Sequence, residues 1–133
     1  MKEISQNKTG IFIAIIALIG LILRVFAFID IPDLYGDEAS LAFNLFDRSI
    51  LEYFIPLNFG QAAPPLFLIF TKFFTLFIKN FEYSLRLIPF VSSILALFAF
   101  YFLSKKFFTK DISIAAAFTL FCLNIKLLAY SVV

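Results

Sequence analysis

Histidine and tryptophan are absent from this chain of 133 residues, and cysteine occurs once, as Cys122. Without histidine there is no imidazole base, no Ser-His-Asp arrangement and no histidine-bearing zinc site. A single cysteine excludes an internal disulfide and a thiolate cluster. Any catalysis must therefore depend on carboxylates, lysine, arginine, tyrosine or backbone groups.

Charge and glycine are also scarce. Only 15% of the residues are charged, where a soluble domain carries about a quarter, and the net charge of +2 is too small to predict a nucleic-acid partner. The four glycines are too scattered for a phosphate-cradling loop. In contrast, 62% of the side chains are hydrophobic and 21 of them are phenylalanine. Such a composition predicts an all-α integral membrane protein with lipid as its surroundings.

Three apolar stretches are long enough to be transmembrane helices, since ~20 helical residues cross a hydrocarbon core of ~30 Å. They cover about 10–29, 84–104 and 112–130. Arg24 interrupts the first stretch near its end, where its side chain can extend to the headgroups. The alternative for the first stretch is a cleaved signal peptide, because Lys2 and Lys8 form a basic start.

A fourth apolar segment, 62–78, has an interfacial pattern. Thr71, Lys72, Thr75 and Lys79 fall on one helical face, with phenylalanines on the rest. Basic residues favour the cytoplasmic side, so the lysines before the first span and those at 105, 106 and 110 should share it. An even number of crossings must separate the two groups. We therefore expect 62–78 to lie on the outer surface; if it crossed, the lysine cluster would face outward.

This topology predicts a cytoplasmic N-terminus and an extracytoplasmic loop with juxtamembrane helices at about 30–82. The loop contains seven of the nine acids, all except Glu3 and Asp111. Asp37 and Glu38 stand out among them, because they follow Gly36 in a turn that leads into an amphipathic helix. Asp37 can act as a helix cap. An ionised carboxylate on the outer surface can equally act as a base that accepts a proton from a hydroxyl group.

Three short motifs in order resemble the start of a C-type membrane glycosyltransferase. They are LYGDEA at 34–39, QAAPPL at 61–66 and EYSLRLIP at 82–89. The nearest group contains the protein O-mannosyltransferases and aminoarabinose transferases, found in bacteria as glycosyltransferase family 39. The resemblance covers nearly the whole chain. It implies a polyprenyl-phosphate sugar donor and a lipid, glycan or protein acceptor at a bacterial inner membrane.

The resemblance also implies roles for individual residues. Asp37 matches the position of the catalytic base, and Glu38 is its regular companion. Some relatives have a lysine near the first proline of the second motif to meet the donor phosphate; this chain has Pro64 there, so the contact would fall to Lys72 or Arg86. Tyr35, in the first motif, is a further candidate for substrate binding.

No cofactor is expected, because the donor already carries a phosphate leaving group; a divalent metal at the carboxylates is possible but not indicated. Members of this family have around a dozen spans, so we expect these 133 residues to be an amino-terminal fragment that is inactive alone. The competing interpretation is a small non-enzymatic membrane protein, such as an accessory subunit or a transporter piece. In that case Asp37 caps a helix and Arg86 anchors the membrane interface.

Overall fold

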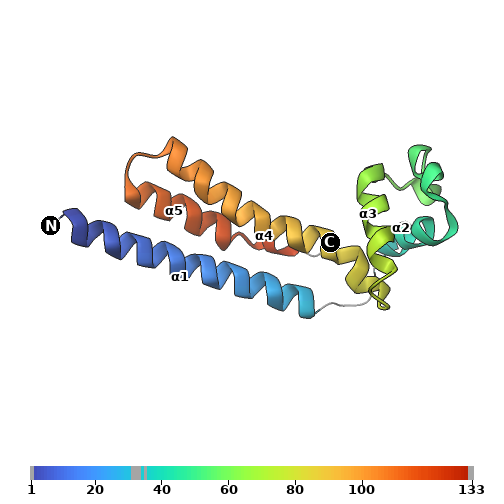
Figure 1. Cartoon of the computed structure of the whole chain (residues 1–133), viewed down its shortest axis with the longest axis horizontal. Helices are drawn as coiled ribbons and strands as arrows, with labels where there is room; N and C mark the ends of the chain where they lie inside the picture. The colour runs from blue at the N-terminus through green and yellow to red at the C-terminus, as the bar shows by residue number, and fades with distance from the viewer. Residues whose placement is uncertain (1, 31–33, 35, 132–133) are drawn as a thin grey trace. The chain divides into compact units, whose positions relative to one another are not determined.

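The computed structural model describes residues 2–30, 34 and 36–131, with side chains from residue 8 onward. All regular elements in these ranges are helical, which confirms the all-α prediction (Figure 1). They are α1 (Lys2–Ile29), α2 (Gly36–Asp47), the 3₁₀ helices η1 (Ile50–Phe54) and η2 (Asn58–Gly60), α3 (Pro65–Thr75), α4 (Phe81–Phe107), α5 (Asp111–Cys122) and α6 (Ile125–Ala129). The chain divides into a first unit, Met1–Ile29 with Pro89–Val132, and a second unit, Asp30–Ile88.

Two helices of the described chain are long and apolar enough to cross a membrane. They are the 22 residues Lys8–Ile29 of α1 and the 27 residues Phe81–Phe107 of α4. At 1.5 Å per residue their lengths are about 33 and 40 Å, against a hydrocarbon core of ~30 Å. By length and composition, these helices support the prediction of a membrane protein.

The prediction of a third continuous span at 112–130 is wrong. Helix α5 ends at Cys122 after 12 residues, or about 18 Å, and α6 has only five residues. The break lies at Leu123 and Asn124. The Asn124 side chain accepts a hydrogen bond from the Leu127 amide at 3.2 Å and so caps the start of α6. The apolar composition of 112–130 predicts one helix, but the cap residue Asn124 within it starts a second one.

Helix α4 begins at Phe81, three residues before the predicted span. Asn80 Oδ1 accepts hydrogen bonds from the amides of Glu82 and Tyr83, at 3.0 and 3.4 Å, and so caps the helix. Because the helix starts early, Pro89 lies in its interior rather than in its first turn. A proline there removes one backbone hydrogen bond. The boundary between the two units falls at this residue.

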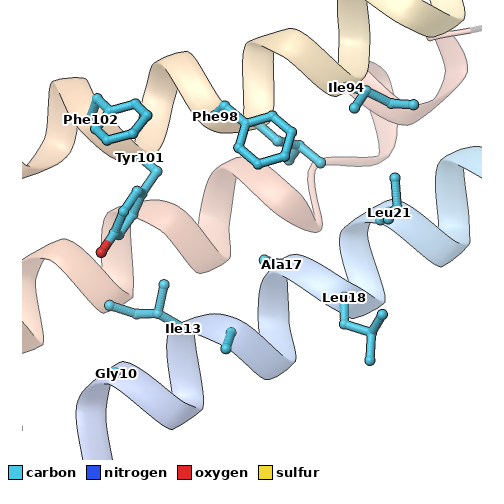
Figure 2. A pocket seen from close by; sticks show the side chains of 11 residues that line it. Gly10, Ile13, Ala17, Leu18, Leu21, Ile94, Phe98, Tyr101 and Phe102 are labelled. Atoms are coloured by element: carbon cyan, nitrogen blue, oxygen red, sulfur yellow. The ribbon is translucent and has the colours of Figure 1, made fainter. Parts of the chain in front are cut away.

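Helices α1, α4 and α5 build the first unit around a core of Ile16, Leu97, Phe118 and Cys122. Phe100 of α4 stacks on Phe121 of α5 with ring centroids 4.2 Å apart. On another side, a groove of about 510 Å³ lies between α1 and α4. Figure 2 shows its lining, which includes Ile13, Ala17 and Leu21 of α1 facing Ile94 and Phe98 of α4. The apolar lining suits a hydrocarbon chain.

Gly20 lies where α1 packs closely against the last residue of α5. A Cβ added there would lie 3.2 Å from the Cβ of Cys122 and 3.3 Å from its Sγ. We expect Gly20→Val to destabilise the first unit by about 1–3 kcal/mol, because overpacking forces the two helices apart. The measurement is the thermal unfolding of the detergent-solubilised chain by circular dichroism.

Gly10→Val is the matched control, since a Cβ at Gly10 meets no atom within 4 Å. Both substitutions replace glycine by the same residue in the same helix, and intrinsic helix propensity slightly favours valine. An equal melting temperature for the two variants would show that Gly20 is not needed for close packing.

The second unit has its own core, formed by Leu45 of α2, Tyr53 of η1, Leu68 of α3 and Leu85 of α4. The Tyr53 hydroxyl donates to the Leu45 carbonyl at 3.0 Å, so this phenol is buried without an unpaired polar atom. Four segments that are far apart in the sequence therefore share one core, and α4 supplies only its first two turns to it.

Helix α3 has 11 residues and is about 16 Å long, roughly half the thickness of a hydrocarbon core. The location of 62–78 on the outer surface stays a prediction of the lysine distribution. In a simple surface helix the polar face would point to solvent, but in α3 the more polar face is the buried one. Thr71 is fully buried and donates to the Phe67 carbonyl, whereas Phe70, Phe73 and Phe77 are exposed. The threonine hydroxyls on the more polar face are satisfied within the helix, and Lys72 donates to the Arg48 carbonyl, so this face can pack inward while the aromatic face stays exposed.

Candidate functional site

The predicted acidic pair lies in the first turn of α2. Helix α2 begins at Gly36, so Asp37 falls inside the first turn, not before it. The dipole of α2 favours a negative charge at this end. Asp37 is exposed and Glu38 is largely covered, because successive helical residues point about 100° apart. The two carboxylates therefore face different surroundings.

Glu38 forms a fork-to-fork ion pair with Arg86. The Arg86 Nε donates to Glu38 Oε1 at 3.2 Å, and Nη2 donates to Oε2 at 2.6 Å. The side chains are 3% exposed for Arg86 and 13% for Glu38. Two parallel bonds from a planar guanidinium fix distance and direction together. The contact joins the first turn of α2 to the first turns of α4, across 48 residues of sequence.

Gln61 connects the second motif to the same place. Its Nε2 donates to Asp37 Oδ1 at 3.4 Å. The turn that leads to it has an unusual backbone, since Phe59 and Gly60 have φ angles of 61° and 67°. A left-handed conformation is strained for phenylalanine and easy for glycine. Gln61 was not singled out as a site residue from the sequence, although the motif that begins with it was.

An amide network holds this turn against α2. Asn44 is buried, accepts a hydrogen bond from the Asn58 amide at 2.8 Å and donates to the Asn58 carbonyl at 3.2 Å. Arg48 Nη2 donates to Asn58 Oδ1 at 2.8 Å. Sequence analysis missed Asn44, whose signal was a polar residue at a core position of an amphipathic helix. These contacts fix the end of the segment that presents Gln61.

Lys72 does not belong to the cluster around Asp37. Its ammonium group donates to the Arg48 carbonyl, just beyond the last residue of α2, and lies 5.5 Å from the centre of the Tyr53 ring. Asp37 and Arg48 are 11 helical steps apart, or about 16 Å along the axis. Lys72 therefore neutralises the C-terminal end of α2, while the acidic pair occupies the N-terminal end. Tyr35, the remaining predicted contact, lies outside the described residues.

One carboxylate away from the cluster has a shifted pKa. The hydroxyl and the amide of Ser49 both donate to Glu52 Oε2 at 2.7 Å, and these bonds lower the pKa of Glu52. The bonds therefore stabilise η1 at neutral pH and are lost only when the pH falls through that lowered pKa. Within the described residues, no group of three or more acids and cysteines is arranged to hold a metal ion.

Comparison with known proteins identifies no relative: no family profile, curated protein or solved structure matches this chain. Its chemistry must therefore be argued from the cluster itself. Asp37, Glu38, Gln61 and Arg86 form a site in which one carboxylate is anchored by a guanidinium and its neighbour is open to solvent. An open carboxylate next to a helix N-terminus can accept a hydrogen bond, and then a proton, from a bound hydroxyl group.

Proposed function

We propose that this chain belongs to a C-type membrane glycosyltransferase that transfers a sugar from a polyprenyl-phosphate donor to an acceptor outside the cytoplasm. One observation supports it above all. Residues from the three motifs on which the resemblance rests, far apart in sequence, meet in one cluster: Asp37 and Glu38 from the first, Gln61 from the second and Arg86 from the third. A chance match of three short motifs gives no reason for such a meeting.

In the proposed reaction, Asp37 is the general base. Its carboxylate takes the proton of the acceptor hydroxyl, and the acceptor oxygen forms a bond to the anomeric carbon of the sugar. The bond between that carbon and the phosphate oxygen breaks, and its electron pair leaves with the polyprenyl phosphate. The configuration at the anomeric carbon inverts. Gln61, in contact with Asp37, orients the carboxylate or the acceptor.

The geometry favours a positioning role for Glu38 and Arg86. Arg86 is buried against the carboxylate of Glu38, so their fork holds the N-terminal end of α2 and sets the direction in which Asp37 points. Contact between Arg86 and the donor phosphate stays a prediction of the resemblance. Lys72, about 16 Å along α2 from Asp37, is poorly located to neutralise a phosphate at the same reacting centre.

The activity is tested with membranes that contain the protein expressed from its complete gene. They are supplied with a polyprenyl-phosphate sugar, such as polyprenyl-phosphate mannose or aminoarabinose, labelled in the sugar. Transfer of label to lipid, glycan or protein acceptors, absent from membranes without the gene, supports the proposal. If neither donor is consumed although the protein is present, the non-enzymatic interpretation replaces it.

The proposed topology places the N-terminus in the cytoplasm and the segment 30–82 outside. Cysteine labelling of the Cys122→Ser chain in intact cells tests this arrangement, because Cys122 is itself buried. A cysteine at the exposed Asp47 should react with an impermeant maleimide from outside. A cysteine at the exposed Thr109 should react only after the cells are opened. Labelling of residue 109 in intact cells would contradict the topology.

A further inference from the structure

Arg24 is a buried charge in the first unit that the proposed reaction does not use. It lies in α1, and its side chain is 1% exposed, so it does not extend to the surface as the sequence suggested. A charged side chain within an apolar span is energetically costly, and such residues usually belong to a binding or functional site. Its polar contacts therefore indicate what the site is for.

The hydrogen-bonding capacity of Arg24 is mostly unused. Nη1 donates to the Gly20 carbonyl at 2.9 Å, and Nε is buried without an acceptor. No carboxylate in the part of the chain that the structure describes forms an ion pair with it. A guanidinium offers five N–H donors, and a buried one normally has a negative partner.

A cavity of about 270 Å³ lies next to this guanidinium. Its wall is apolar apart from Arg24 and four hydroxyl-bearing residues, Ser92, Ser93, Tyr130 and Ser131. Ser93 and Ser131 donate their hydroxyl hydrogens to backbone carbonyls, and a neutral hydroxyl group carries no negative charge that could balance the guanidinium. The volume is far larger than the ~30 Å³ that one water molecule occupies. The cavity thus combines one positive charge, no negative charge and room for a small group.

The position of Arg24 along α1 indicates what kind of anion could reach it. It precedes Ile29, the last residue of α1, by five residues, or about 7.5 Å. That is close to the level at which headgroups begin if α1 spans the bilayer. The phosphate of a lipid headgroup is therefore the anion placed to reach it.

We propose that Arg24 and the cavity beside it bind the phosphate group of an anionic lipid. In the cavity, the Arg24 guanidinium donates hydrogen bonds to the phosphate oxygens. The phosphate replaces the missing carboxylate, and a planar guanidinium suits its geometry. This inference does not depend on the proposed transferase activity, because it involves none of the residues around Asp37.

Native mass spectrometry of the detergent-solubilised 133-residue chain tests the site. Phosphatidylglycerol is the anionic probe, phosphatidylcholine the zwitterionic one and millimolar inorganic phosphate the free anion. We expect phosphatidylglycerol to bind at least tenfold more tightly than phosphatidylcholine, whose ammonium already neutralises its phosphate. Equal affinity for the two lipids would overturn the anionic requirement. Displacement of phosphatidylglycerol by inorganic phosphate would show a site for free phosphate and overturn the assignment to lipid.

Two variants alter the site by independent routes. Arg24→Leu removes the charge, and Ala96→Phe fills the cavity while Arg24 remains. Each should weaken phosphatidylglycerol binding about tenfold or more, whereas Lys106→Gln, which removes an exposed cation on α4, should bind like the parent. Helix content is measured by circular dichroism, and if Arg24→Leu does not fold, Ala96→Phe decides. Parental affinity in a folded Ala96→Phe chain would overturn the proposal.

Discussion

Replacement of Asp37 by asparagine should reduce sugar transfer by about 10²- to 10⁴-fold at an unchanged level of protein in the membrane. This is the usual effect of removing a general base. The amide keeps the size and an acceptor oxygen of the carboxylate but cannot take up a proton at neutral pH. The measurement is the initial rate with a labelled polyprenyl-phosphate sugar, in membranes carrying the protein expressed from its complete gene.

Asp47→Asn provides the matched control. Asp47 is an exposed carboxylate at the opposite end of α2, and the substitution makes the same chemical change without touching the cluster. It should transfer sugar at close to the parental rate. If Asp37→Asn is as active as Asp47→Asn, Asp37 serves only to stabilise the start of α2, and the catalytic assignment is wrong.

Loss of either member of the Glu38–Arg86 pair should destabilise the second unit strongly. Glu38→Leu leaves a guanidinium that is 3% exposed without its carboxylate, and Arg86→Leu leaves the carboxylate without its cation. Breaking a buried pair in this way typically costs about 3–5 kcal/mol. The expected result is a lower midpoint of chemical denaturation, followed by circular dichroism because the chain has no tryptophan.

The double variant Glu38→Leu/Arg86→Leu separates pairing from simple truncation. It removes both charges at once, and such replacements by apolar side chains are often close to neutral. The double variant should therefore be more stable than either single variant. Lys79→Leu, at an exposed lysine, should match the parent. If the two single effects simply add in the double variant, the fork contributes no coupling energy and cannot be what positions α2.

The positions of individual helices could be predicted from the sequence, because helix formation depends on neighbouring residues. The apolar runs around 10–29 and 84–104 predicted the two long helices, since length and hydropathy alone determine whether a helix can cross a bilayer. The amphipathic pattern after Gly36 predicted a helix there, although α2 already begins at Gly36 and so includes Asp37 and Glu38 in its first turn. The prediction of one continuous span at 112–130 was wrong because Asn124 caps a new helix, α6, and average hydropathy does not detect a cap residue.

Tertiary structure alone decided which residues meet. Sequence could order Asp37, Glu38, Gln61 and Arg86 along the chain, but the pairing of Glu38 with Arg86 depends on the packing of α2 and α4 in a shared core. The same packing assigned Lys72 to the opposite end of α2 and left Asp37 as the open carboxylate. Arg24 is a further case, because it is buried only where α1 packs against other segments of the first unit. Helix formation is governed by interactions three or four residues apart, whereas the environment of a charge is governed by whichever distant segments fold against it.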